Sequence, residues 1–387
     1  MNFDYNEEQR LLAESVRRFV AQEYSFEARR KIVASPEGYS ARVWTSLADL
    51  GLLGLPISPD YGGFGGGAVD MMSTMEAFGE ALVVEPYLAT VGLGARIVAR
   101  AGTQAQRQAL LPAIAEGRIK MAFAQTERDA RYNLAHVGLA ARKSGAGYVL
   151  DGEKRMVLHA PCADQLIVSA RAWGRVDEPR GVSLFLVDAK AAGVETRACR
   201  TLDELRAADI TFKGVAVPAD ALLGAEGEGL EAIEDAVDFA TALVCAEAVG
   251  AIKSANDATL EYLKTRKQFG VPIGSFQALQ HRMVDMAISC EQARSMASLA
   301  CARVDSEKDA AERKRIVSAA KIRIADACRH VSQESVQLHG GMGMSEELKV
   351  SHTFRRLTMI AQQFGNADHH LERFAATSSS TRAESAQ

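Results

Sequence analysis

A short stretch two thirds of the way along the chain combines two cations, an amide and an aromatic ring. Arg266, Lys267, Gln268 and Phe269 are consecutive, and Gly270 follows them. Cationic groups bind phosphate and an aromatic side chain stacks on a flat ring, so this stretch could hold a nucleotide-like ligand. It could instead be a basic last turn that complements a helix dipole, with Phe269 packed in the core. Residue types alone favour this second interpretation.

A helical hairpin is predicted to position this stretch. Apolar residues recur at steps of three and four over residues 249–262, and Gly270 and Pro272 end that helix. Ser275 is expected to cap a second helix, in which the apolar period continues over residues 283–304 for about seven to eight turns. The cationic stretch therefore lies at the turn between two long helices.

The bulk composition indicates an ordinary globular protein. The chain has 387 residues, of which 48% are hydrophobic and 24% charged, and a formal net charge of -4, which favours two or three domains and no nucleic-acid surface. The N-terminal stretch lacks the apolar core of a secretory signal and no apolar run could span a membrane, so we expect a cytoplasmic location. The six cysteines form no C-x-x-C pair, which predicts reduced packing residues and no metal site.

The residue periodicity changes twice along the chain. Residues 1–118 read as helices, at 43–53, 71–82, 88–100 and 104–116. Residues 119–224 alternate with a period of two in short runs at 148–150, 166–168, 182–187 and 210–212, as in a β-sandwich or β-barrel domain. Residues 225–377 return to long helices, and 378–387 read as a disordered polar tail. The predicted fold class is α+β, mostly α.

A glycine-rich segment could be mistaken for a dinucleotide fingerprint. The stretch from Gly63 to Ala68 matches G-x-G-x-x-A and leads into a helix. However, Pro56 and Pro59 break the approach, so no strand precedes it. A Rossmann domain is therefore not predicted.

Three motifs together resemble the acyl-CoA dehydrogenase family of flavoproteins. They are Arg266-Lys267-Gln268-Phe269-Gly270 with Phe276-Gln277 following, Gln337-Leu338-His339-Gly340-Gly341-Met342-Gly343, and Val217-Pro218-Ala219-Asp220 with Leu223-Gly224. The resemblance covers nearly the whole chain and implies a C-terminal four-helix bundle and an FAD cofactor. It also implies α,β-dehydrogenation of an acyl-CoA, in which a glutamate removes the α-proton and the β-hydrogen leaves as hydride to the flavin.

The glutamate that this reaction requires is missing from both positions where the family carries it. One position aligns with Phe364, which is expected to complete an apolar helical stripe, and the other aligns with Ala240. Glu247 lies seven residues after Ala240 on the same helix face, and Asp238 lies two residues before it. Either could be a replacement base, although both are expected to be solvated surface carboxylates. No catalytic residue is therefore assigned.

The loop that approaches the flavin in the family is also altered. The family pattern Thr-Glu-x-Gly-x-Gly-Ser aligns with a stretch in which only Thr126-Glu127 survives, and Arg128 and Arg131 bring bulk and charge. A Trp-Ile-Thr segment aligns with Met156-Val157-Leu158, which lacks the hydroxyl able to bond flavin N5. The resemblance therefore implies a damaged flavin seat and a blocked or reshaped acyl pocket.

The retained motif residues are those that, in the family, act on the cofactor of the neighbouring subunit. The predicted cofactor-binding residues are Arg266, Gln268, Phe269, Gln277, Gln337, Gly340 and Gly341. The chain resembles the small or non-catalytic subunit of heteromeric pimeloyl-CoA-type and steroid side-chain dehydrogenases. This implies an α2β2 assembly with a Glu-bearing paralogue, an acyl-CoA substrate and an electron-transfer flavoprotein as acceptor. The alternatives are a non-enzymatic structural or regulatory partner, a self-sufficient homomer with an unrecognised base, and an acyl-CoA oxidase.

Two further groups of polar residues are expected to be structural. Asp368-His369-His370 could suggest a metal site, but adjacent histidines on a helix project about 100° apart, so a polar interface is favoured. His339 could bond the cofactor edge or be a satisfied structural histidine. The cations of the helix around residue 320 are expected to form a solvated face; they are Arg315, Lys321, Arg323 and Arg329.

Overall fold

Contacts within the chain divide it into two units. The structure is a computed structural model that describes residues 6–384, with side chains up to Thr377. The first unit contains residues 1–30, 67–83 and 241–387, and the second contains residues 31–66 and 84–240. The longest helix, α7 (Leu230–Thr265), begins in the second unit and continues in the first.

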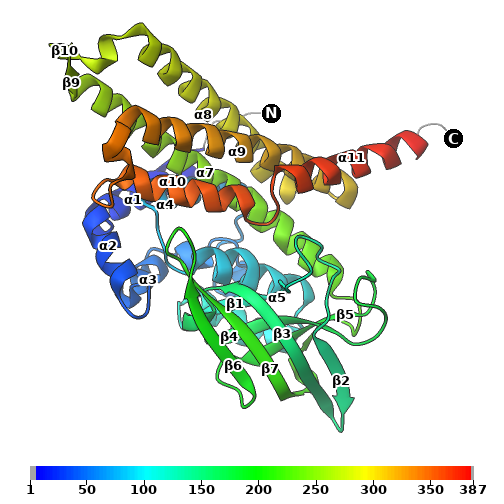
Figure 1. Cartoon of the computed structure of the whole chain (residues 1–387). Helices are drawn as coiled ribbons and strands as arrows, with labels where there is room; N and C mark the ends of the chain where they lie inside the picture. The colour runs from blue at the N-terminus through cyan, green and yellow to red at the C-terminus, as the bar shows by residue number, and fades with distance from the viewer. Residues whose placement is uncertain (1–5, 385–387) are drawn as a thin grey trace. The chain divides into compact units, whose positions relative to one another are not determined.

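The first unit is helical (Figure 1). Beside the second half of α7 it contains α1 (Glu7–Glu23), α4 (Ala68–Ala81), α8 (Gln277–Val304), α9 (Ala310–His339), α10 (Lys349–Gln362) and α11 (Ala367–Glu384). Helices α8 and α9 pack along their length, and α10 and α11 also pack on α9. The backbones of α4 and α7 touch, because a Cβ added at Gly250 would overlap the carbonyl oxygen of Glu76. Glycine is required at this crossing.

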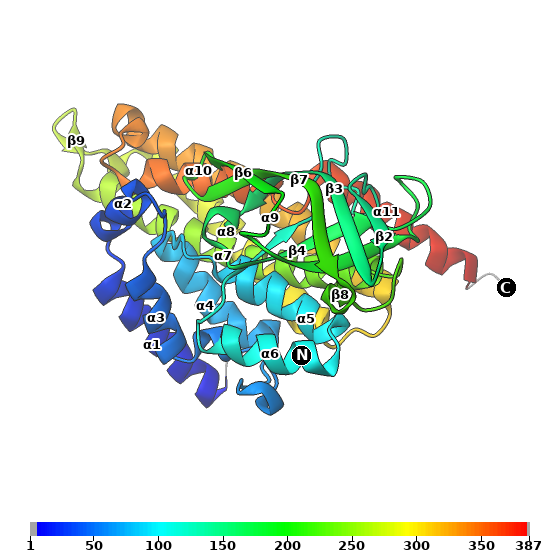
Figure 2. The ribbon, with the colours of Figure 1, turned by 90° about the horizontal axis from the view of Figure 1, so that it is seen from below.

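The second unit combines an eight-stranded sheet with short helices. The sheet order is β6-β7-β3-β2-β4-β5-β8, and β1 pairs in parallel with β4 (Figure 2). The strands are β1 (Met121–Ala124), β2 (Ala140–Ser144), β3 (Gly147–Leu158), β4 (Gln165–Arg171), β5 (Val182–Asp188), β6 (Val194–Arg200), β7 (Arg206–Pro218) and β8 (Leu222–Leu223). A core of alternating apolar residues from these strands fills the sheet domain.

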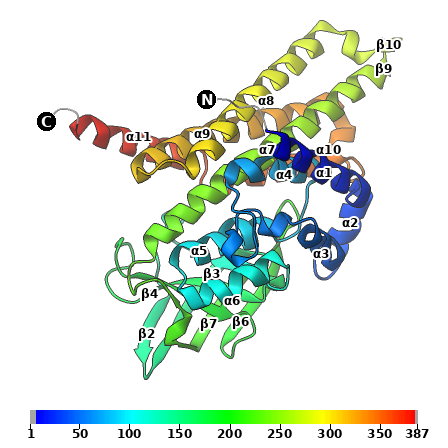
Figure 3. The same ribbon diagram turned by 180° about the vertical axis from the view of Figure 1, so that it is seen from behind.

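Helices cover one side of this sheet, as Figures 1 and 3 show for α5 (Arg96–Ala101) and α6 (Gln104–Ala115). They follow a π-helix, η3 (Leu88–Ala95), which contacts β1 and in which Thr90 Oγ1 accepts a hydrogen bond from Met121 N. The unit also contains α3 (Ala41–Asp49), the short helices η1 (Leu52–Gly54) and η2 (Pro59–Tyr61), and the end of α2 (Phe26–Ala34).

The fold confirms the predicted succession of helices, sheet and helices, and corrects several local expectations. The run 88–100 is a π-helix followed by a short α-helix, and β1 and β6 were not predicted. Ser275 does not cap α8: its hydroxyl donates to Pro272 O at 2.7 Å, and the helix begins at Gln277. Helix α11 continues to Glu384, into the expected disordered tail, and residues 385–387 lie outside the described residues.

Among residues 6–384, no helix is both long and apolar enough to cross a bilayer.

Candidate functional site

The cationic motif forms a small hairpin at the end of α7. Strand β9 (Lys267–Gln268) pairs with β10 (Val271–Pro272), and Phe269 and Gly270 form the turn with positive φ angles of 55° and 84°. The Phe269 side chain is 92% exposed and meets Phe276 edge to face at 6.1 Å. The interpretation of Phe269 as a core residue is therefore wrong, and the turn presents its ring outward.

The second motif forms a tight turn at the end of α9. Gly340 ends the helix with φ +61°, and η7 (Gly340–Met344) follows. A Cβ placed at Gly340 or Gly341 would meet no described atom within 4 Å, so the backbone of this turn is open to an approaching group. Gln337, one turn before the helix end, is exposed as well.

An aromatic stack joins these two motifs. Tyr262 of α7 stacks on His339 of α9, with ring centroids 4.4 Å apart and planes inclined by 26°. Burial lowers the pKa of His339, and its Nδ1–H donates to Ser335 O at 2.8 Å. His339 is thus a satisfied structural histidine that packs the end of α9 against the last turns of α7.

All seven predicted cofactor-binding residues are exposed in the chain. They are Arg266, Gln268, Phe269, Gln277, Gln337, Gly340 and Gly341. A guanidinium, three flexible amides, an uncovered aromatic ring and open backbone at two glycines fit the phosphates and flat rings of a dinucleotide. Their exposure means that the ligand they fit would approach from outside this unit.

The first family position of the glutamate lies in a loop, not on a helix. Helix α10 ends at Gln362, and Phe364 follows with φ +60°, so the expected helical stripe does not reach it. Lys321 Nζ donates to Ala361 O at 3.2 Å and Gly365 O at 2.8 Å. His370 Nε2–H donates to Phe364 O at 3.2 Å.

These contacts also correct two expectations for cations and histidines. Lys321 is fully buried, not part of a solvated face, because its ammonium group binds the carbonyls after α10. His370 is buried too, its Nδ1 lies 3.2 Å from Ser318 Oγ, and burial lowers its pKa to about 2. Both side chains hold the loop around Phe364 in place.

The candidate replacement bases are buried and engaged. Glu247 is 5% exposed, and its carboxylate forms a bidentate pair with Arg356 at 2.6 and 2.7 Å. Asp238 and Ala240 are fully buried. The expectation that Glu247 and Asp238 are solvated is therefore wrong. Both oxygens of the Glu247 carboxylate are therefore already occupied by the guanidinium of Arg356.

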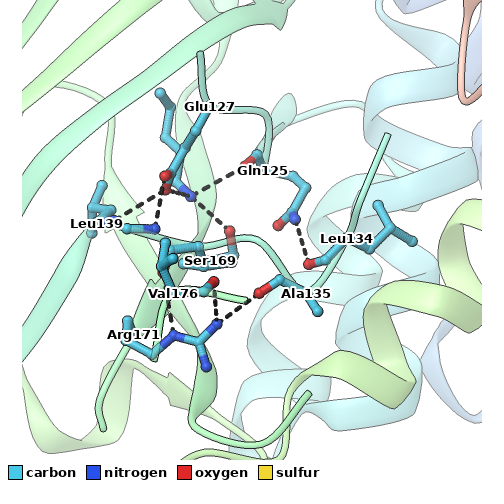
Figure 4. A network of polar contacts seen from close by, with 11 residues as sticks. Gln125, Glu127, Leu134, Ala135, Leu139, Ser169, Arg171 and Val176 are labelled. Carbon is cyan, nitrogen blue, oxygen red and sulfur yellow. Dashed lines mark hydrogen bonds and ion pairs between the residues drawn. The ribbon is translucent and has the colours of Figure 1, made fainter. Parts of the chain in front are cut away.

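A buried polar network that sequence reasoning missed lies in the sheet domain (Figure 4). Lys154 Nζ donates to Glu127 at 2.7 Å, Ser169 Oγ at 2.9 Å and Gln125 O at 3.2 Å. Glu127 also accepts from the backbone of Gly138 and Leu139. Burial lowers the pKa of Lys154 to about 8, while Lys154 holds the pKa of Glu127 below its usual value despite burial.

Arg171 anchors the neighbouring loops through backbone carbonyls (Figure 4). Its guanidinium donates to five of them, at distances between 2.6 and 3.2 Å. The acceptors are Val137, Glu178, Arg180, Ala135 and Val176. The only sequence signal for these networks was a lysine and an arginine in β-rich runs.

The residues expected to disrupt flavin binding lie at the surface of the chain. Arg128 and Arg131 are exposed, and Arg131 has φ +47°. Met156 lies at an irregularity of β3 with φ +52° and is half exposed. Asp209 clamps this irregularity, accepting from Met156 N at 3.1 Å and Arg155 Nη1 at 2.8 Å. Arg128 and Arg131 therefore place exposed positive charge on the loop that follows Thr126-Glu127.

The cysteines are free thiols. Four are buried, and Cys162 and Cys199 are partly exposed. The buried ones lie on the long helices; they are Cys245, Cys290, Cys301 and Cys328.

Comparison with known proteins shows the family. The models for the acyl-CoA dehydrogenase N-terminal, middle and C-terminal domains match residues 6–118, 122–215 and 227–378. Acyl-CoA dehydrogenase FadE12 of Mycobacterium tuberculosis is 30% identical over 372 residues, or 93% of each chain. The probable acyl-CoA dehydrogenase YngJ of Bacillus subtilis is 29% identical, covering 96% of this chain and 98% of YngJ. The chain belongs to the acyl-CoA dehydrogenase family of oxidoreductases.

Solved structures agree in fold over nearly the full length. The Tcur3481-Tcur3483 steroid acyl-CoA dehydrogenase variant has a TM-score of 0.87 at 28% identity, covering 97% of this chain and 99% of that chain. The ChsE4-ChsE5 complex of Mycobacterium tuberculosis has a TM-score of 0.87 at 26% identity, covering 97% and 98%. PigA with FAD and proline has a TM-score of 0.89 at 27% identity, with the same coverage.

Proposed function

We propose that this chain is the subunit of an FAD-dependent acyl-CoA dehydrogenase that lacks the catalytic glutamate and completes the FAD site of a Glu-bearing partner in an α2β2 assembly. One observation carries the proposal: all seven predicted cofactor-binding residues are exposed, while Phe364 and Ala240 occupy the two positions that we align with the family's glutamate. The chain thus keeps groups that can act on a neighbour and has none at the positions where its own base would stand. Two-component relatives, the ChsE4-ChsE5 complex and the Tcur3481-Tcur3483 protein, support this proposal.

The residues that would hold the cofactor follow from the exposed set. Arg266 and the open backbone of Gly340 and Gly341 would bind the diphosphate, and Gln268 and Gln337 would bond polar edges. Phe269 would pack on an adjacent ring or apolar surface of the partner. When bound, FAD accepts the hydride that leaves the β-carbon of the acyl-CoA. The structure of PigA, which contains FAD, supports this cofactor.

Within this proposal, the chain contributes orientation and charge rather than proton transfer. The guanidinium of Arg266 would offset the negative charge of a diphosphate, and the Tyr262–His339 stack fixes the last turns of α7 against the end of α9. The partner would supply the base that removes the α-proton. The substrate class would be a medium-length, dicarboxylic or polycyclic acyl-CoA, and an electron-transfer flavoprotein would reoxidise the cofactor.

A self-sufficient homomer is the less favoured alternative. It would need Glu247 or Asp238 as base, and Glu247 is paired with Arg356 on both oxygens. A purely structural partner without any dehydrogenase activity in its assembly would not need the exposed Arg266 and Gln268 at a glycine turn. These contacts favour the heteromeric enzyme.

The test is to purify the chain alone and together with the Glu-bearing paralogue, and to measure bound flavin and its bleaching by acyl-CoA. We expect a colourless, inactive chain alone, and about one FAD per αβ pair with turnover in the complex. A yellow chain that acyl-CoA bleaches without a partner would contradict the proposal.

A substitution then separates cofactor binding from assembly. Arg266→Ala should weaken FAD binding by the complex about tenfold to a hundredfold, because a charge-assisted hydrogen bond is lost. Lys264→Ala, two residues away and paired with Glu261 on the exposed last turn of α7, is the matched control and should leave FAD binding unchanged. Equal affinities in both variants would remove Arg266 from the site.

A further inference from the structure

A pocket of about 240 Å³ opens in the second unit, apart from the motifs described above. It lies among the segment before η2, the π-helix η3, α5 and α7. Its apolar walls are formed by Pro56, Ile57, Val91, Ala95, Ala99 and Phe239. Phe239 precedes Ala240 on α7, but consecutive helical residues point about 100° apart, so the pocket and the glutamate position lie on different faces of that helix.

One of the two arginines in the lining is held rigidly. Arg96 donates to Asp235 through Nε at 2.6 Å and through Nη2 at 3.1 Å. Its guanidinium carbon also lies 4.5 Å from the centroid of the Phe239 ring. The carboxylate of Asp235 and the ring of Phe239 therefore fix Arg96 against the wall of the pocket.

The other arginine keeps its terminal donors available. Arg100 contacts Asp235 only through Nε, at 3.3 Å, and is 53% exposed. Among the described side chains and backbone, the contact of Nε with Asp235 is the only hydrogen bond of the Arg100 side chain. The residues that line the pocket include two guanidinium groups and no carboxylate. A fork of N–H donors beside apolar walls matches a carboxylate joined to an apolar body.

From these contacts, we propose that this pocket binds a small monocarboxylic acid, with its carboxylate on Arg100 and its hydrocarbon chain against Ala95, Ala99 and Phe239. The volume corresponds to about eight waters at ~30 Å³ each, which suits an acid of hexanoate size. A phosphate ester would leave the apolar walls bare, and a cation would find no carboxylate among the lining residues, since Asp235 is bound by the two arginines. The free acid is therefore the occupant that satisfies both the walls and the charge.

The experiment is calorimetric titration of the full chain with sodium hexanoate, 1-hexanol and sodium acetate in a buffer free of carboxylates. Hexanoate should bind one to one with a dissociation constant of roughly 1–10 mM, as for a ligand of this size. Hexanol lacks the charge and acetate lacks the chain, so each should bind at least tenfold more weakly. Absence of hexanoate binding up to about 50 mM, well above that range, overturns the proposal.

Variants identify the site. Arg100→Gln should weaken hexanoate binding about tenfold, because the charged fork is removed. Arg118→Gln is the matched control in the same unit, exposed and paired with Glu116 at 2.5 Å, and should have no effect. Ala99→Leu keeps both charges but fills the pocket, and should abolish hexanoate binding. Unchanged binding in Arg100→Gln or Ala99→Leu would place the acid elsewhere and overturn the assignment.

Discussion

At Glu247, both carboxylate oxygens accept hydrogen bonds from Arg356, and both side chains are buried. Removing one member of such a pair lowers the stability of the fold more than removing both, because the remaining charge is then left unpaired in the interior. This makes Glu247 a stabilising residue of α7 and α10. Replacing both members of the pair therefore distinguishes a structural role of Glu247 from a catalytic one.

The single variant Glu247→Leu should lose about 3–5 kcal/mol of unfolding free energy, whereas Glu247→Leu with Arg356→Met should regain most of it. Urea unfolding of the chain measures both. Combined with the Glu-bearing partner, the double variant should keep its FAD content and turnover. A stable double variant that assembles but no longer turns over would identify Glu247 as part of the chemistry.

A second buried carboxylate, Glu76 on α4, is poorly compensated. Its Oε1 has no hydrogen-bond partner among the described atoms, and its Oε2 lies 3.6 Å from Arg294 Nη1. Burial raises the pKa of Glu76 above its usual value near 4.5, and Arg294 offsets this only in part. The folded chain therefore holds this proton more tightly than the unfolded chain does.

The stability that this proton contributes should be present below about pH 4.5 and should decrease as pH rises through the raised pKa. Glu76→Gln cannot ionise, so we expect it to be more stable than the natural chain by about 1 kcal/mol at pH 8 and to differ little at pH 4.5. Unfolding midpoints in urea at the two pH values check this. Glu14→Gln, an exposed carboxylate on α1, is the control; an equal gain there would contradict the explanation.

At the scale of elements, buried or half-buried cations hold the C-terminal ends of helices. Lys321 binds the carbonyl of Ala361 in the last turn of α10 and that of Gly365 just after the helix. Arg29 donates to Leu82 O at 2.8 Å, and Lys349 donates to Glu80 O, both at the end of α4. These carbonyls have no partner within their helix, and a cation there is favoured by the helix dipole. Such contacts fix where each helix stops.

We therefore expect Lys321→Met to destabilise the chain by about 2–3 kcal/mol, since two charge-assisted hydrogen bonds are lost. Hydrogen exchange should accelerate in residues 361–370, the segment that Lys321 holds. Arg329→Met changes an exposed cation of the same helix, α9, and should have little effect on either measurement. If exchange accelerates equally in both variants, Lys321 does not cap α10.

The limits of sequence reasoning are clearest in these elements. Stripes of apolar residues predicted the long helices α7 and α8, because burial follows a helical period. The same stripes placed Lys321 on a solvated face, since its carbonyl partners lie forty residues further along. The hydroxyl of Ser275 satisfied a local carbonyl instead of capping α8, a choice that residue type does not determine.

In the candidate site, too, the sequence indicated some features and missed others. Motif spacing picked out the residues of the hairpin and the glycine turn, whose role at a cofactor stays a prediction, and the Tyr262–His339 stack joins the two helices that carry them. The burial of Glu247 and the Lys154–Glu127 pair depend on partners distant in sequence, so no local pattern revealed them. Local periodicity therefore predicts the helices and strands, whereas contacts between residues distant in sequence determine the environment of each charged side chain.

For the whole molecule, exposure of the hairpin makes assembly testable. Phe269→Glu should leave the melting temperature of the lone chain within about 1 °C, because the ring is exposed and makes few contacts there. It should prevent stable association with the partner, measured by sedimentation velocity and by FAD retention. Leu11→Glu, at an exposed apolar site on α1, is the control and should assemble normally. Normal assembly of Phe269→Glu would exclude the hairpin from the interface.

The outward ring of Phe269 also has a consequence inside the cell. A subunit synthesised in excess would display this phenylalanine, together with exposed Met342 and Met344, to chaperones and proteases that recognise uncovered apolar side chains. In the proposed α2β2 assembly, its lifetime would then depend on how quickly it meets the Glu-bearing partner. Balanced translation of the two proposed subunits, rather than intrinsic stability, would set how much of this chain accumulates.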